Sequence, residues 1–229
     1  MKTIGLLGGM SWESSIEYER VINEYVRARL GGSSSASLIV RSYNFAEIHG
    51  LQEAGGWEVA GVRLAADAAL LEASGAEIII LCTNTMHRLA DQIRAAITVP
   101  FLHIADATAS RIIEAGERKV GLLGTRFTME GDFYVGHLEA HGLDVLVPEK
   151  ADRTIVHDVI YKELVRGVVS TESREQFARI ADSLIARGAE AIIAGCTEIE
   201  LLLQPDDVSV SYYPTARIHA ETAARAALA

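Results

Sequence analysis

An internal repeat is the feature that most constrains how this chain folds. Thr3–Ser14, TIGLLGGMSWES, is similar to Lys119–Glu130, KVGLLGTRFTME, and Gly75–His87, GAEIIILCTNTMH, is similar to Gly188–Glu200, GAEAIIAGCTEIE. The offsets are 116 residues (121 − 5) for the first glycine, 113 (188 − 75) for GAE and 114 (196 − 82) for the cysteine. Two matches in the same order at nearly one offset indicate two copies of one folding unit.

Strand and helix patterns alternate regularly along the chain, which predicts a parallel α/β architecture. The segment EIIILC is continuous and β-branched, as in strands buried on both faces of a parallel sheet. We expect strands at Thr3–Gly8, Ser37–Arg41, Glu77–Cys82, Lys119–Gly124, Val145–Val147 and Ala189–Ala194. We expect helices at Ser11–Leu30, Gly61–Ala73, Leu89–Ile93, Ala105–Ala115, Phe127–Ala140, Thr154–Arg166, Ser173–Arg187 and Ile218–Leu228.

The repeat predicts two pseudo-symmetric parallel-sheet α/β domains with an active site between them. The first domain is expected to span residues 1–98 and 207–229 and to carry Cys82. The second is expected to span residues 99–206 and to carry Cys196.

The charge of the chain excludes several classes of partner. A formal net charge of −10 repels nucleic-acid backbones and anionic lipid surfaces. No stretch reaches the roughly 18 apolar residues that a membrane span needs. We therefore expect a cytoplasmic protein that binds neither nucleic acid nor membrane.

Each cysteine lies at the carboxyl end of an expected strand, where open α/β sheets bind their ligands. Inverting a stereocentre at Cα without a cofactor needs a base on one face and an acid on the other. Two equivalent domains supply such a pair in Cys82 and Cys196. The alternative interpretation is two buried cysteines that act as small hydrophobic residues.

Polar residues follow both cysteines at expected strand-to-helix turns. A helix N-terminus lowers a thiol pKa and attracts anions, so we expect reactive thiols and backbone N–H groups that hold a substrate carboxylate. The residues concerned are Thr83, Asn84 and Thr85 after Cys82, and Thr197 and Glu198 after Cys196.

Cofactor motifs are missing from the sequence. The start GLLGGMS matches neither dinucleotide nor P-loop patterns, and we interpret its glycines as room for substrate. His137 and His141 have a metal-ligand spacing outside the H-E-x-x-H pattern, and we interpret them as solvated. The four lysines lack a recognisable pyridoxal-phosphate context, and two cysteines outside a C-x-x-C pair make no disulfide framework. We predict no cofactor and no metal.

The segments LCTNTMH and GCTEIELL, together with GLLGGMSWES and HIADAT, resemble the aspartate/glutamate racemase family over almost the whole chain. The resemblance implies an isomerase that acts without pyridoxal phosphate or metal, a substrate at the domain interface and a homodimer. It implies that Cys82 and Cys196 are the catalytic pair. The implied substrate-carboxylate positions are Met10, Ser11, Thr83, Asn84, Thr85, Thr125, Thr128 and Thr197.

Specificity positions match the family less closely. Gln52 and Arg166 fall nearest the places where family members read an acidic side chain, but a solvated loop residue and a C-terminal helix cation are equally open interpretations. Where related sequences carry F-D-T-T, this chain has Tyr213, Pro214, Thr215 and Ala216, which lack the aspartate of the usual helix cap.

Aspartate or glutamate is the expected substrate, and other activities remain open. The same scaffold supports thiol-dependent isomerases and decarboxylases of small carboxylates, because fold alone does not fix the reaction. A decarboxylase needs only one proton donor, so two cysteines argue against it. A non-catalytic protein that binds a small carboxylate is the second alternative.

Overall fold

Two four-stranded parallel sheets form the framework, one from each half of the repeat. The computed structural model describes residues 1–229. The first sheet has strand order β2-β1-β3-β4 and the second β6-β5-β7-β8, which is the same order in both halves. All six neighbouring strand pairs are parallel. The predicted fold class, two similar parallel α/β domains, is therefore confirmed.

The chain divides into two compact units. Unit 1 is Met1–Ile104 with His219–Ala229, and unit 2 is Ala105–Ile218. The domain limits predicted from the sequence, after residues 98 and 206, lie earlier in the chain than these, because the prediction did not include two short edge strands. β4 (Phe101–Leu102) pairs with β3 of the first sheet, and β8 (Ser211–Pro214) pairs with β7 of the second.

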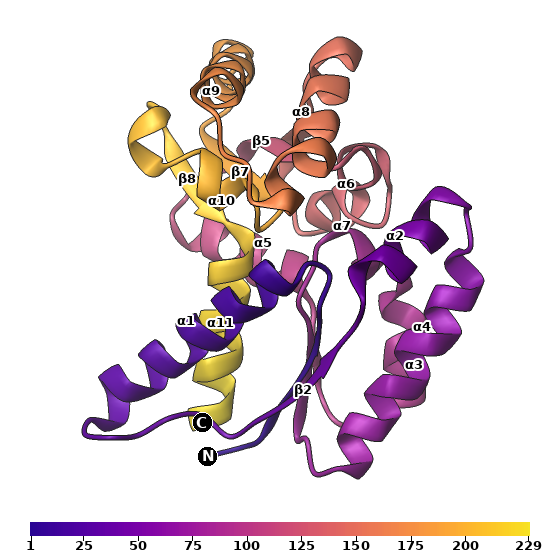
Figure 1. Ribbon diagram of the computed structural model, residues 1–229. Coiled ribbons are helices and arrows are strands. Elements are labelled where there is room, and N and C mark those ends of the chain that lie inside the picture. The colour runs from indigo at the N-terminus through magenta and orange to yellow at the C-terminus, as the bar shows by residue number, and fades with distance from the viewer. The chain divides into compact units, whose positions relative to one another are not determined.

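Unit 1 has its core on the two central strands, β1 and β3, whose residues are all buried. Figure 1 shows α1 and the part of α11 from His219 onward on one side of this sheet and α3 and α4 on the other. Both termini belong to this unit, and the Lys2 N–H donates to the Ala227 carbonyl. The elements are β1 (Ile4–Gly8), α1 (Trp12–Leu30), β2 (Leu38–Ser42), α2 (Phe45–Glu53), α3 (Trp57–Ala73), β3 (Ile78–Leu81), the 3₁₀ turn η1 (Thr85–Leu89), α4 (Ala90–Ala96), β4, and most of α11 (Thr215–Leu228).

Unit 2 repeats this arrangement around buried β7 and nearly completely buried β5. Its elements are α5 (Ile104–Glu114, whose first residue belongs to unit 1), β5 (Lys119–Gly124), α6 (Arg126–Glu130), α7 (Val135–Ala140), β6 (Asp144–Leu146), α8 (Lys150–Lys162), η2 (Leu164–Arg166), α9 (Thr171–Ala186), β7 (Ala191–Gly195), α10 (Ile199–Leu202), η3 (Pro205–Asp207), β8 and the start of α11. No helix is long and apolar enough to cross a membrane.

Close packing explains why the first glycine recurs in both copies. A Cβ on Gly5 would come within 2.7 Å of the Ile79 side chain, and one on Gly121 within 2.8 Å of the Ile192 side chain. The missing side chain leaves room for the neighbouring strand and for the helix that leads into it. These are β3 and α3 in unit 1, and β7 and α9 in unit 2.

The GAE motif has an equivalent role in both units. Its glutamate binds the chain at the start of the central strand: Glu77 Oε2 accepts the Thr3 N–H at 2.8 Å, and Glu190 Oε2 accepts the Arg118 and Lys119 N–H groups at 2.7 and 3.0 Å. These hydrogen bonds satisfy backbone donors at the start of each central strand.

Two helices differ from the sequence expectation. The helix expected over Phe127–Ala140 is divided into α6 and α7 because Gly131 adopts an extended conformation that ends α6. The helix α2 was not expected. Its signal was Asn44, whose side chain accepts the Ala46 N–H at the N-cap, with Glu47 three residues later.

Candidate functional site

Cys82 is fixed by the central strand and by the first helix. It directly follows β3 and is fully buried. Its N–H donates to the Leu7 carbonyl at 2.9 Å, and its carbonyl accepts the Ser14 hydroxyl at 3.1 Å. The backbone of this cysteine is therefore held by both β1 and α1.

Cys196 has a similar place but a different neighbour. It directly follows β7 and is partly buried. Its thiol donates to Oε2 of Glu198 at 2.9 Å, and Glu198 is itself 5% exposed. A carboxylate in direct contact with a thiol is arranged to take up its proton.

The structure contradicts the expectation of lowered thiol pKa values. Burial raises the pKa of the Cys82 thiol, and burial together with the nearby Glu198 carboxylate raises that of Cys196. The following helical segments are also short, a five-residue 3₁₀ turn and the four-residue α10, so their dipoles offer little compensation. Both thiols are therefore protonated in the free protein at neutral pH, and each needs a base to become a thiolate.

The expected carboxylate-binding residues of the first loops are helix caps. Ser11 Oγ accepts the Ser14 N–H, and Thr125 Oγ1 accepts the Thr128 N–H, each at 3.3 Å. The offset between the two caps is 114 (125 − 11), the same as between the cysteines. Met10, next to the first cap, is 4% exposed. These hydroxyls are thus fixed at equivalent helix starts in the two units.

The polar residues after the cysteines are buried or nearly so. Asn84, Thr85 and Thr197 are 4%, 5% and 7% exposed. Asn84 stands two residues after Cys82, where the second unit has Glu198 two residues after Cys196. The repeat therefore places an amide beside one cysteine position and a carboxylate beside the other.

A family model for the Asp/Glu/hydantoin racemases matches residues 7–223. The chain belongs to the Asp/Glu/hydantoin racemase family. This is a family of isomerases that act on small substrates, so the prediction of an isomerase is confirmed at that level.

Two solved structures are similar to this racemase-family chain over the full length of both proteins. A candidate Asp/Glu racemase from Yersinia pestis is 50% identical with a TM-score of 0.94, and an aspartate racemase homologue from Pyrococcus horikoshii is 36% identical with a TM-score of 0.87. The broad-specificity amino-acid racemase RacX of Bacillus subtilis is 26% identical over 58% of this chain, and the match spans 57% of RacX.

The two candidate specificity residues differ in environment. Gln52 is buried in α2, and its Nε2 donates to the sulfur of Met86 in η1 at 3.1 Å. The alternative of a solvated loop residue is therefore wrong. Arg166 is exposed in η2, which packs against α10 just after Cys196 and Glu198.

The glycines of the first loop have a packing role. A Cβ on Gly9 would lie 2.3 Å from the Tyr43 nitrogen and 2.4 Å from its oxygen, and a Cβ on Gly8 would lie 2.6 Å from Ser15 Oγ. Gly9 also has φ +81°, which favours glycine. The interpretation of both as room for substrate is wrong, because protein atoms fill that space.

The departure from the family's F-D-T-T segment is accommodated by other bonds. Thr215 starts α11 and is fully buried, and its hydroxyl donates to the Ala194 carbonyl at 2.8 Å. The Tyr213 hydroxyl donates to Glu117 at 2.6 Å. These bonds attach the start of the last helix to β7 and to the segment before β5.

His137 and His141 are paired rather than simply solvated. Both Nε2 atoms approach Oδ1 of Asp106 on α5, at 2.5 and 3.3 Å. His141 Nδ1 also donates to the His137 carbonyl. Polar contacts with Asp106 join α5 to the end of α7 and account for this spacing.

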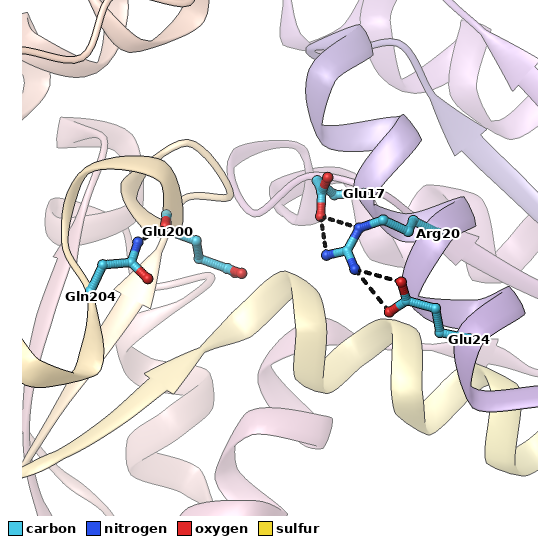
Figure 2. A network of polar contacts seen from close by, with 5 residues as sticks. All are labelled: Glu17, Arg20, Glu24, Glu200 and Gln204. Carbon is cyan, nitrogen blue, oxygen red and sulfur yellow. Dashed lines mark hydrogen bonds and ion pairs between the residues drawn. The ribbon is translucent and has the colours of Figure 1, made fainter. Parts of the chain in front are cut away.

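Polar side chains also form hydrogen bonds within helical segments of both units. The Arg20 guanidinium lies between the carboxylates of Glu17 and Glu24 on α1, the helix that carries Ser14 (Figure 2). In unit 2, the side chain of Gln204 donates to the Glu200 carbonyl at 2.6 Å and holds the end of α10 (Figure 2). The exposed α1 pairs are worth only about 0.3–0.5 kcal/mol each.

The sequence analysis missed His87, the last residue of LCTNTMH. It is buried, its Nδ1 lies 2.7 Å from the Thr83 carbonyl, and its Nε2 accepts the Ile104 N–H at 3.2 Å. The available signal was its place four residues after Thr83, which brings it back to that carbonyl across one turn.

His87 gives a pH dependence of stability. Burial and the neighbouring His103 and His219 lower the pKa of His87 well below 6.5. Below about pH 6.5 the unfolded chain binds a proton here and the folded chain does not, so the free energy of unfolding should fall by up to about 1.4 kcal/mol per pH unit from this residue. Urea unfolding between pH 7.5 and 5.5 measures this slope, and His87→Asn should reduce it. Partly exposed His49→Asn is the control, and equal slopes in both variants would contradict the assignment.

Proposed function

We propose that this chain is a cofactor-independent amino-acid racemase that interconverts the L and D forms of aspartate or glutamate. Cys82 and Cys196 act on opposite faces of Cα, one as base and the other as acid. The equivalent attachment of the two cysteines supports this proposal most strongly. Each follows the same strand of a duplicated sheet, with a hydroxyl-capped helix start 71 residues before it (82 − 11 and 196 − 125).

The proton transfers follow from the thiol environments. Glu198 takes the proton of the Cys196 thiol, and the Cys196 thiolate then takes the Cα proton of the substrate. The Cys82 thiol donates its proton to the opposite face of the carbanion and becomes a thiolate. The reverse reaction begins at that thiolate. Burial, which raises both thiol pKa values, makes each thiolate a stronger base toward the weakly acidic Cα proton.

Hydroxyls and backbone N–H groups hold the substrate carboxylate in this proposal. Ser11 and Thr125 are the N-cap residues of α1 and α6, so their hydroxyls lie at helix starts, where the helix dipole favours an anion. Such a local site is needed because the net charge of −10 repels an acidic amino acid at long range.

The proposal includes a cytoplasmic homodimer. Apolar surface for contact between copies is present on α3, where Val59, Val62 and Leu70 are 62%, 67% and 59% exposed on one face.

Incubation with L-amino acids in deuterium oxide tests the proposal. L-aspartate or L-glutamate should yield the D enantiomer with one deuterium at Cα, detected by chiral chromatography and mass spectrometry. Turnover should persist after dialysis against a chelator and treatment with a carbonyl reagent. Loss of activity that pyridoxal phosphate restores would contradict the proposed chemistry.

A one-thiol reaction is the second candidate, and one observation favours it. Only Cys196 has a carboxylate hydrogen-bonded to its sulfur, as expected where one cysteine alone protonates a carbanion after decarboxylation. Release of carbon dioxide from a small malonate, without racemisation of any amino acid, would favour this candidate. A protein that binds carboxylates without turnover should keep its affinity after thiol alkylation.

Arg166 is proposed to read the acidic side chain of the substrate. Arg166→Ala should lower kcat/KM for aspartate and glutamate about 10- to 100-fold more than for neutral amino acids, the value of one charge-assisted hydrogen bond of about 1.5–3 kcal/mol. Lys162→Ala, which removes a nearby exposed cation from α8, is the control. Equal losses for acidic and neutral substrates would show that Arg166 does not contact the side chain.

A further inference from the structure

The buried His87 has a defined tautomer. A carbonyl only accepts, so Nδ1 carries the proton that is donated to the Thr83 carbonyl. Nε2 accepts the Ile104 N–H and is therefore unprotonated. His87 thus joins the residue directly after Cys82 to the segment that follows β4.

A second buried histidine joins the same segment to two helices. His219 Nε2 donates to the Leu102 carbonyl, and its Nδ1 accepts the Tyr18 hydroxyl, both at 2.9 Å. His219 belongs to α11 and Tyr18 to α1, and both are buried. Hydrogen bonds on both sides thus hold the segment from Leu102 to Ile104.

This segment is one of the two places where the chain passes between units. The chain leaves unit 1 after Ile104 and returns to it at His219. His87 is hydrogen-bonded to Ile104, the last residue before the first crossing, and His219 is the first residue after the second crossing. His87 also binds the Thr83 carbonyl, next to Cys82.

We propose that His87 is a positioning residue that holds the Cys82 thiol in its reactive orientation by fixing the Thr83 carbonyl to the segment at which the chain leaves unit 1. The proposal rests on the proposed function in naming Cys82 as a catalytic thiol. His87 acts on the thiol through the Thr83 carbonyl, which accepts its Nδ1 proton.

Only the neutral imidazole supports this arrangement. A second proton on Nε2 would face the Ile104 N–H and leave both donors without an acceptor. The groups around the ring oppose that proton too, because His103 lies 4.5 Å away between ring centroids, His219 lies 5.8 Å away and the Arg94 cation is also near. The Tyr18 hydroxyl is turned to His219. The geometry is therefore stable across the neutral pH range.

Two amide substitutions separate positioning from simple packing. In His87→Asn the amide N–H reproduces the donor to Thr83, whereas the longer side chain of His87→Gln reaches toward Ile104 and leaves Thr83 without a donor. We measure kcat, KM and the rate at which iodoacetamide modifies Cys82, followed by peptide mass spectrometry. His87→Leu removes both hydrogen-bonding groups, and His49→Asn, at a partly exposed histidine on α2, is the control.

The positioning role predicts an ordered result. His87→Asn should keep kcat within about threefold of wild type, whereas His87→Gln and His87→Leu should lower kcat about tenfold or more with little change in KM, the loss expected from a small misplacement of a reacting group. Alkylation of Cys82, but not of Cys196, should become about tenfold faster in the same two variants. Equal kcat and equal Cys82 alkylation in Asn and Gln variants would overturn the proposal, even where His87→Leu fails to fold.

The alkylation readout keeps this inference separate from the proposed function. If wild-type protein racemises no amino acid, the proposed function fails. The difference in Cys82 alkylation between His87→Asn and His87→Gln still shows whether the hydrogen bond from His87 to Thr83 fixes the position of Cys82. If racemisation occurs and that contrast is missing, only the role of His87 is wrong.

Discussion

Cys82→Ser and Cys196→Ser should each lower racemisation by about 10²- to 10⁴-fold or more, the loss expected when positioned acid–base catalysis is removed. Both variants should fail alike, because inversion needs a proton removed on one face and delivered on the other. Chiral chromatography after incubation with either enantiomer measures this loss.

Exchange with solvent distinguishes the two cysteines. The remaining thiol of each variant can still remove the Cα proton on its own side and return deuterium to the same side. The resemblance to the aspartate/glutamate racemases predicts that Cys196 serves the L enantiomer and Cys82 the D enantiomer. Cys82→Ser should therefore still exchange L substrate, and Cys196→Ser should exchange D substrate, as measured by mass spectrometry in deuterium oxide.

The serine variants should remain folded, because serine is close to cysteine in size and circular dichroism can verify this. Cys82 is fully buried, so its hydroxyl replacement carries a larger risk, and Cys82→Ala provides a second variant without a buried polar group. Racemisation at the wild-type rate by any of these variants would exclude the two-thiol mechanism.

Glu198→Gln should lower kcat about 100-fold, at the lower end of the range for general acid–base catalysis. The amide still accepts the Cys196 thiol at the same position but cannot take its proton. Activity of the variant should then rise with pH, because solvent hydroxide must replace the carboxylate as the base. The pH profile of kcat/KM measures this change.

The loss should be equal in both directions of the racemisation. Two enantiomers have equal free energy in water, so a variant enzyme cannot change their equilibrium ratio, and kcat/KM must fall by one factor for both. Glu200→Gln on α10 is the matched comparison: it also removes a charge that raises the Cys196 pKa, whereas the acceptor of the thiol is Glu198, so the pair of variants separates loss of the hydrogen-bonded base from loss of a nearby charge. A flat pH profile with unchanged kcat in Glu198→Gln would show that Cys196 is deprotonated in another way.

Part of the fold was predictable because its signals are local. The continuous apolar run before Cys82 and the repeated GLLG and GAE segments each predict a buried strand or its start from neighbouring residues alone. The short edge strands Phe101–Leu102 and Ser211–Pro214 could not be recognised, since two to four residues carry no period. Because each of these strands pairs with the sheet of its own unit, the units extend further along the chain than the sequence predicted.

The site divides in the same way. The duplicated cysteines and the polar residues that follow them can be recognised in the sequence, because gene duplication leaves a constant offset. Their proton affinities cannot, because a thiol pKa depends on how much water and charge surround the sulfur. Burial by residues far along the chain raised both values where a helix N-terminus alone would have lowered them.

The sequence by itself determined two similar parallel α/β units, each ending a buried strand in a cysteine, and membership of a racemase family. Only the tertiary structure decided that Gln52 is buried against Met86, that Gly9 packs on Tyr43, and that His87 connects Thr83 to Ile104. The physical reason is distance along the chain: the contacts Gln52–Met86, Gly9–Tyr43 and His87–Ile104 join residues 17 to 34 positions apart through packing, whereas periodicity and capping act within a few residues.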